Sequence, residues 1–191
     1  MKIVSFNING IRARLHQLQA LITKHQPDII GLQEIKVHDD EFPLADVQAM
    51  GYHVYHFGQK GHYGVAILSK FTPNSIVLGM DNPMYDEEGR VIRINFTHFS
   101  ILSCYFPSGS SSIERQDFKM KFLDSFFVFV EKLKQNVDNL IITGDFNLCH
   151  QAIDIHNPIS NAKSSGFLPE ERAWVSKFLE SGFIDSFRFF N

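Results

Sequence analysis

The hydrophobic residues of this chain alternate between short apolar runs and longer stretches in which they recur with helical spacing. Residues 2–8, which are apolar at Ile3, Val4, Phe6 and Ile8, predict a strand, and Asn9-Gly10 ends it, with Asn9 as a candidate N-cap for the next helix. Helical spacing follows over residues 11–25, and Pro27 separates that helix from a second buried run at residues 28–32. A strand, a helix and a strand in this order are typical of a parallel β-α-β unit.

The middle of the chain predicts β-hairpins, and the last third returns to helices. A short helix is expected near residues 42–50, and β-rich runs separated by Gly, Asn, Asp and Pro then indicate antiparallel pairs at 52–57, 64–69, 75–78, 90–96 and 99–106. Ser111 and Glu114 resemble a capping box, which would open a long helix ending near residue 135. A buried strand at 139–143 and a helix at 169–181 complete the pattern.

Composition places the chain among ordinary globular proteins. Its 191 residues fit one domain, and 44% hydrophobic residues with 19 Phe can supply a core. No apolar run approaches the roughly 20 residues of a membrane span, and the chain opens directly on a strand, so we expect a cytoplasmic protein with no membrane association. Two cysteines cannot form a disulfide framework. A net charge of −3 excludes a strongly basic nucleic-acid binder, but it leaves open one that works with a cation.

Polar side chains follow the predicted buried strands at the points where those strands end. The residues concerned are Asn7, Glu34, Tyr105, Asp145 and Asn147. Carboxylate and amide oxygens suit a hard divalent cation such as Mg²⁺, which would polarise a phosphoryl oxygen. The alternative is that these residues only cap loops and turns. A zinc site is disfavoured because no HExxH motif occurs, and neither a Gly-x-Ser-x-Gly elbow nor a GxxxxGK[ST] loop is present.

Seven blocks of sequence resemble the exonuclease III class of apurinic/apyrimidinic endonucleases, and they occur in the order of that family. The first family signature is similar to PDIIGLQEIK at residues 27–36. The others are FNINGIRAR at 6–14, KGHYGVAILSK at 60–70, EEGRVIRINF at 87–96, CYFPSG at 104–109, GDFNLCHQAIDI at 144–155 and FLPEERAWVSKFLESGFIDSFR at 167–188. The resemblance implies a four-layer α/β sandwich, in which two mixed sheets pack face to face between helices.

The resemblance also implies a chemistry, namely Mg²⁺-dependent hydrolysis of DNA phosphodiesters, with Mn²⁺ as a possible substitute. Glu34 would bind the metal, and Asn7 would support the metal shell. Tyr105 would contact the scissile phosphate, Asp145 would orient or deprotonate the attacking water, and Asn147 would hydrogen-bond beside it. Phosphate contacts that position the DNA are expected from Arg12, Lys36, Arg90 and Arg115. The expected partner is double-stranded DNA with abasic sites or blocked 3′ ends, bound by a monomer.

The family pattern continues beyond the point where these 191 residues stop. A further Asp and a terminal Ser-Asp-His have no counterpart here, and we expect the second sheet to lack its last strands. Three hypotheses therefore stand. The first is a base-excision-repair nuclease with abasic endonuclease, 3′→5′ exonuclease and 3′-phosphatase activities. The second is a shortened and catalytically inactive form of that enzyme. The third is a related phosphatase that acts on a small phosphate ester.

Overall fold

The computed structural model describes residues 1–59 and 61–190, and it divides into two compact units. The first unit comprises Met1–Phe106 with Glu131–Phe146, and the second comprises Pro107–Val130 with Asn147–Asn191. The single domain that the sequence predicts for residues 1–191 stays a prediction. Among the described residues, no helix is long and apolar enough to cross a membrane.

The first unit holds two mixed sheets. One has the order β1-β2-β4-β3 and the other the order β5-β6-β7-β8. The strands are β1 (Ile3–Asn7), β2 (Ile29–Gln33), β3 (His53–Gln59), β4 (His62–Ser69), β5 (Ser75–Leu78), β6 (Val91–Asn95), β7 (Ser100–Tyr105) and β8 (Leu140–Asp145). The β1–β2 pair is parallel and the pairs of the middle strands are antiparallel, as the sequence pattern predicts, and the parallel β7–β8 pair is a further feature that the pattern does not specify. Whether the second sheet lacks strands found in relatives stays a prediction.

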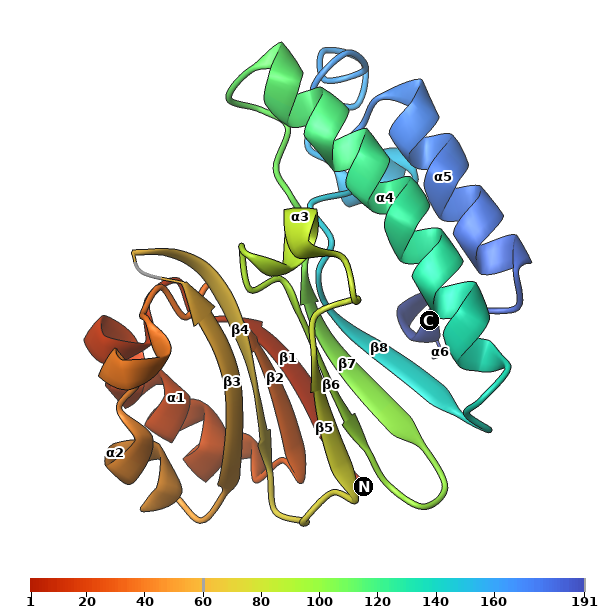
Figure 1. Ribbon diagram of the computed structural model, residues 1–191. Coiled ribbons are helices and arrows are strands. Elements are labelled where there is room, and N and C mark those ends of the chain that lie inside the picture. Colours follow the sequence, from red (N-terminus) through yellow and green to blue (C-terminus); the bar gives the residue numbers. More distant parts are fainter. Residues whose placement is uncertain (60, 191) are drawn as a thin grey trace. The chain divides into compact units, whose positions relative to one another are not determined.

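Helix α1 (Ile11–His25) and the short helix α2 (Leu44–Gln48) lie along one face of the first sheet (Figure 1). Residues Ile11, Leu18 and Ile22 of α1 are buried in one cluster with Ile30 and Leu68 of the sheet. Helix α1 has the predicted bounds, because Gln26 leaves the helix in a left-handed conformation immediately before Pro27. The predicted cap is wrong, however, since Gly10 occupies the N-cap position and the Asn9 side chain does not cap the helix.

The two sheets pack against each other through branched aliphatic side chains. Buried residues from both sheets form this layer, and they are Ile29, Val65, Ile67, Ile92, Ile94 and Ile101. The sheets approach each other closely at Gly31, where an added Cβ would lie 2.7 Å from Thr143 Oγ1 and 3.1 Å from Ser103 Oγ. Hydrogen bonds also cross this layer, because Gln33 Nε2 donates to Ser103 Oγ at 3.0 Å. The structure thus confirms a mixed α/β fold with two packed mixed sheets.

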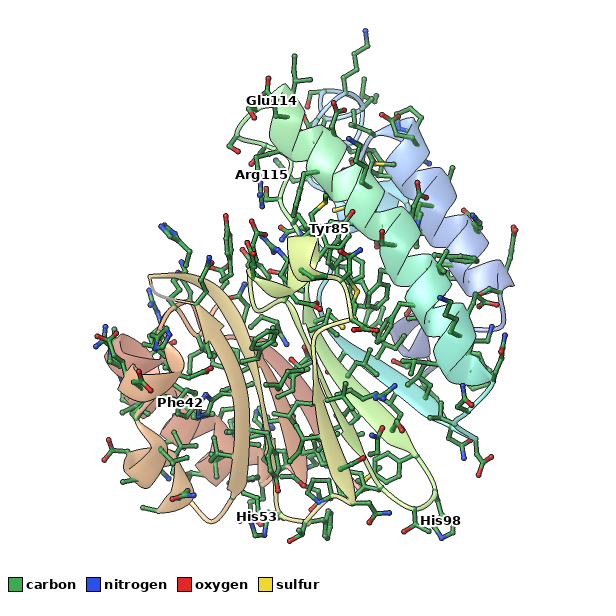
Figure 2. The ribbon with its side chains drawn as sticks, in the orientation of Figure 1. Phe42, His53, Tyr85, His98, Glu114 and Arg115 are labelled. Atoms are coloured by element: carbon green, nitrogen blue, oxygen red, sulfur yellow. The ribbon has the colours of Figure 1, made fainter. Side chains whose placement is uncertain are left out.

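The two parallel pairs finish at one edge of the first unit. Asn7 pairs in register with Gln33, and Tyr105 pairs with Asp145. Figure 2 shows His98, in the β6–β7 turn, at the end opposite to the one where β7 finishes. The short helix α3 (Pro83–Asp86) and the 3₁₀ turn Asp39–Glu41, which the sequence pattern does not predict, also belong to this unit.

The second unit is helical. It contains α4 (Ile113–Lys134) up to Val130, α5 (Pro169–Glu180), the 3₁₀ turn Ala152–Asp154 and the short helix α6 (Ser186–Phe190). Helices α4 and α5 lie side by side (Figure 1), with the rings of Phe126 and Phe178 6.1 Å apart and Trp174 stacked on Phe178 at 5.0 Å. Ser112, rather than the predicted Ser111, caps α4, because its Oγ accepts the Arg115 backbone N–H at 3.2 Å.

Candidate active site

The side-chain amide of Asn7 hydrogen-bonds to both of the carboxylates that the sequence predicts to be functional, Glu34 and Asp145. Asn7 Nδ2 donates to Glu34 Oε1 and to Asp145 Oδ2, each at 2.8 Å. Asn7 and Glu34 follow adjacent strands of the first sheet, and Asp145 ends β8 of the second sheet. Three predicted residues from distant parts of the sequence therefore meet at one edge of the first unit.

Local backbone geometry holds Asn7 and Glu34 in place. Backbone pairing continues past the ends of β1 and β2, since Ile8 N donates to Gln33 O at 3.0 Å and Gly10 N donates to Glu34 O at 2.7 Å. Glu34 itself has a positive φ of 53°, an uncommon conformation for a residue other than glycine. Asn7 Oδ1 accepts the Asn9 backbone N–H at 3.0 Å, which turns the Asn7 amide nitrogen toward the carboxylates.

Hydrogen bonds keep Glu34 in its charged form. Partial burial alone would raise the pKa of Glu34, but hydrogen bonds from Asn7, Lys36 and Tyr105 outweigh it, so that the pKa is lowered from its ordinary value. Lys36 Nζ lies 2.7 Å from Glu34 Oε2 and 2.5 Å from Asn9 Oδ1. Glu34 thus carries the negative charge that a cation ligand needs at neutral pH.

Tyr105 is held as a neutral phenol beside Glu34. Burial is the largest cause of the raised pKa of Tyr105, and the negative charge of Glu34, which is also its hydrogen-bond partner, raises it further. The phenol therefore keeps its proton and can donate a hydrogen bond to an anionic group. Tyr63, which the sequence reasoning did not single out, places its ring 6.2 Å from that of Tyr105.

Arg90 is deeply buried beneath these two rings. Its side chain is 1% exposed, its Nε lies 2.5 Å from Glu88 Oε2, and its Nη1 donates to Tyr105 O at 2.9 Å. The guanidinium also lies 4.2 Å from the centre of the Tyr63 ring. The predicted phosphate contact of Arg90 stays a prediction, and its observed contacts are those of a residue that supports Tyr105.

The remaining predicted phosphate contacts lie at more exposed positions. Arg12 is 59% exposed and lies 3.5 Å from Glu41, and the Lys36 side chain is 34% exposed. Arg115, labelled in Figure 2, stands in the first turn of α4 with its guanidinium 4.4 Å from the Phe118 ring centre. The phosphate contacts assigned to Arg12, Lys36 and Arg115 stay predictions.

Asn147 belongs to the second unit, where its backbone takes a left-handed conformation with a φ of 50°. Its carbonyl oxygen accepts a hydrogen bond from Lys119 Nζ at 2.8 Å. The sequence reasoning missed Lys119, because a lysine in an amphipathic helix is ordinarily exposed. The role of Asn147 in the reaction stays a prediction.

The carboxylates of Glu34 and Asp145 fit a hard divalent cation, and Asn7 supports them through its amide nitrogen rather than as a ligand. Both carboxylates have an oxygen within hydrogen-bonding distance of one amide nitrogen, and they supply the one or two protein carboxylates that Mg²⁺ commonly uses. Within residues 1–59 and 61–190, no cluster of three or more His, Cys, Asp or Glu side chains suited to a metal occurs. The site therefore fits a cation that completes its shell with water and substrate, rather than a closed protein cage.

Comparison with known proteins places the chain in a family. The model of the Endonuclease/Exonuclease/phosphatase family matches residues 4–190. Exodeoxyribonuclease III of Haemophilus influenzae is 44% identical over 203 residues, which cover 100% of this chain and 76% of that protein. The DNA-(apurinic or apyrimidinic site) endonuclease of Dictyostelium discoideum is 39% identical over 100% of this chain and 54% of its own length.

Solved structures give the same result. An AP endonuclease from Archaeoglobus fulgidus superposes with a TM-score of 0.91 at 33% identity, covering 98% of this chain and 73% of that one. A 3′ phosphatase from Neisseria, bound to a product DNA hairpin, gives 0.92 at 31% identity over 98% and 74% of the two chains.

The chain belongs to the endonuclease/exonuclease/phosphatase family, which is one of metal-dependent enzymes. Within that family it belongs to the branch of exodeoxyribonuclease III and the AP endonucleases, as its sequence motifs predict.

Proposed function

We propose that this chain is a metal-dependent DNA-repair nuclease that cleaves phosphodiesters at abasic sites, releases nucleotides from 3′ ends and hydrolyses 3′-phosphates on double-stranded DNA. The observation that carries the proposal is the Asn7 amide, which bridges Glu34 and Asp145 at 2.8 Å each. The Asn7 amide nitrogen donates to both carboxylates, of which Glu34 would bind a cation and Asp145 would bind a water molecule. The relatives, named as exonuclease III, AP endonuclease and 3′ phosphatase, support the same chemistry.

Each residue then has a distinct task. Glu34, with Asn7 beside it, would hold Mg²⁺ or Mn²⁺, and the bound cation would polarise a phosphate oxygen and stabilise the charge that develops on it. Tyr105 keeps its proton and donates a hydrogen bond to the scissile phosphate. The Asp145 carboxylate accepts a hydrogen bond from the attacking water and aligns it, and Asn147 hydrogen-bonds beside it. Positioning and charge stabilisation are the main demands of this chemistry.

Affinity for DNA is assigned to positive side chains that contact phosphates. Arg12, Lys36 and Arg115 are proposed to bind the backbone without reading sequence, while buried Arg90 supports Tyr105 from below. The DNA-binding constant should therefore fall as the salt concentration rises. The slope of its logarithm against the logarithm of salt concentration should be roughly proportional to the number of phosphates contacted.

The test is hydrolysis of three duplexes in Mg²⁺, one with an abasic site, one with a 3′-phosphate and one with a recessed 3′-hydroxyl. Asp145→Asn should lower kcat on the abasic duplex by more than about tenfold, with a smaller change in KM, because its work lies in the transition state. Asp40→Asn is the matched control, since that carboxylate is 90% exposed. A rate for Asp145→Asn within tenfold of the unsubstituted chain would remove Asp145 from the mechanism. No cleavage of any duplex by the unsubstituted chain, with or without turnover of a small phosphate ester, would refute the nuclease proposal.

A further inference from the structure

We propose that a buried ion pair, Lys119 with Glu171, is a positioning device that fixes the turn at Asn147. The two charged atoms lie 2.6 Å apart, and the side chains are 1% and 0% exposed. This inference rests on the proposed function, in which Asn147 hydrogen-bonds beside the attacking water. Lys119, Glu171 and Asn147 all belong to the second unit.

The Glu171 carboxylate is fully engaged. One oxygen accepts from Lys119 Nζ and from Gln116 Nε2, the latter at 3.0 Å. The other oxygen accepts the backbone N–H groups of Gly166 at 2.7 Å and Leu168 at 2.9 Å. Glu171 stands at the third position of α5, where a carboxylate that reaches back to preceding N–H groups also meets the favourable end of the helix dipole.

Lys119 connects this carboxylate to the segment that carries Asn147. Its ammonium also donates to Asn147 O at 2.8 Å. A second contact comes from Gly166, whose carbonyl accepts the Cys149 N–H at 2.7 Å. A Cβ on Gly166 would lie 3.2 Å from Asn147 O, so the two backbones pass close to each other. The turn at Asn147 is therefore held from the side of α4 and from the side of the 166–168 segment.

Stability alone does not account for this arrangement. Replacing a buried ion pair with apolar residues of similar size is often neutral or stabilising, because removing two charges from water is costly. Apolar residues could pack the same space, but they could not donate a hydrogen bond to Asn147 O. Asn147 takes a left-handed backbone with a φ of 50°, which asparagine tolerates, and the Lys119 ammonium holds the carbonyl oxygen of that residue. The ion pair thus supplies a hydrogen bond to the Asn147 carbonyl that apolar packing could not supply.

The decisive comparison uses the unsubstituted chain as the baseline and Lys119→Met/Glu171→Gln as the test. Glutamine also serves at this helix position, and the double variant removes both charges without leaving either one buried alone. Methionine has the length of lysine but no donor. We expect the double variant to have a kcat at least about tenfold below the baseline on an abasic duplex, with KM within about threefold, because the loss falls on the transition state. Lys121→Met, the same change at an exposed position of α4, should match the unsubstituted chain. Equal kcat values for the baseline and the folded double variant would overturn the inference.

Two further measurements separate this inference from the proposed function. The side-chain amide signals of Asn147 in ¹⁵N–¹H spectra should move in the double variant and stay in place in Lys121→Met; unmoved signals in the double variant overturn the inference even if the chain has no turnover. Asn147→Ala supplies the benchmark for rate. Wild-type kcat in Asn147→Ala would overturn both the assigned role of Asn147 and the catalytic purpose of the pair. If the double variant does not fold, Lys119→Leu/Glu171→Gln repeats the test with a second apolar side chain that lacks a donor, and an unchanged kcat in that folded variant counts against the inference.

Discussion

Replacing Asn7 with alanine tests the geometry that defines the candidate site. The substitution removes two hydrogen bonds to carboxylates, each of 2.8 Å. A hydrogen bond to a charged group contributes about 1.5–3 kcal/mol net. The Glu34 side chain is 18% exposed, so water replaces part of the loss, and we expect about 1.5–3 kcal/mol of unfolding free energy to be lost in total. Because the two carboxylates lose the group that joins them, kcat should also fall by about tenfold or more.

The same substitution has a pH signature. The hydrogen bond from Asn7 opposes the effect of burial and helps to lower the pKa of Glu34, so its removal should raise that pKa. The ionised carboxylate is the form that binds a cation, and the acid limb of kcat/KM against pH should therefore move to higher pH in Asn7→Ala. A lowered pKa stabilises the folded state above the ordinary pKa of the group and loses that effect as pH falls through the folded value. The variant should accordingly lose folding stability at neutral pH and less at acidic pH.

The assay is steady-state cleavage of an abasic duplex at saturating Mg²⁺ across the pH range, with thermal unfolding of the same samples. Asn74→Ala is the control, because Asn74 is an exposed asparagine of the same unit whose side chain hydrogen-bonds to Thr97. If Asn7→Ala kept kcat within threefold of the unsubstituted chain and left the acid limb in place, the amide bridge would have no part in catalysis.

Three other predictions follow from the structure. Tyr105→Phe removes only the hydroxyl that donates toward Glu34 and, in the proposal, the phosphate, so single-turnover rates should fall by about tenfold or more while duplex binding holds; an unchanged rate would contradict that role. Gly31→Ala places a Cβ 2.7 Å from Thr143 Oγ1 and should cost about 1–3 kcal/mol of unfolding free energy, measured by urea titration against the unsubstituted chain. Mg²⁺ should raise the melting temperature of the unsubstituted chain by mass action but not that of Glu34→Gln, and equal shifts in both would place the cation elsewhere.

Sequence alone predicts the framework of this molecule and the meeting of its carboxylates. Helix α1 has its predicted bounds because hydrophobic spacing and Pro27 both mark them. Asn7, Glu34 and Asp145 meet because the carboxyl ends of parallel strands finish at one edge. They could be predicted together because the motifs that contain them are specific to the family. Both predictions rest on patterns within short segments of sequence, and the same segments form the predicted elements in the structure.

Other features depend on contacts that no local pattern encodes. Asn9 resembles an N-cap by type, but its side chain accepts from Lys36 instead. Arg90 resembles a surface cation, yet it is buried with Glu88 under two tyrosine rings. The pair of Lys119 and Glu171 joins two helices far apart in the sequence, and charged residues are almost never fully buried unless paired, so each one alone predicts exposure. A partner must be known before such a residue can be placed.

The narrow contact at Gly31 has a consequence for how this enzyme can change. Glu34 follows a strand of one sheet and Asp145 ends a strand of the other, so the gap between the two carboxylates is inherited from the thickness of the hydrophobic layer between the sheets. A methyl group added at Gly31, far from solvent, would widen the gap between the two carboxylates without touching either of them. Interior substitutions chosen only to raise thermal stability would therefore be expected to alter the proposed site as a by-product.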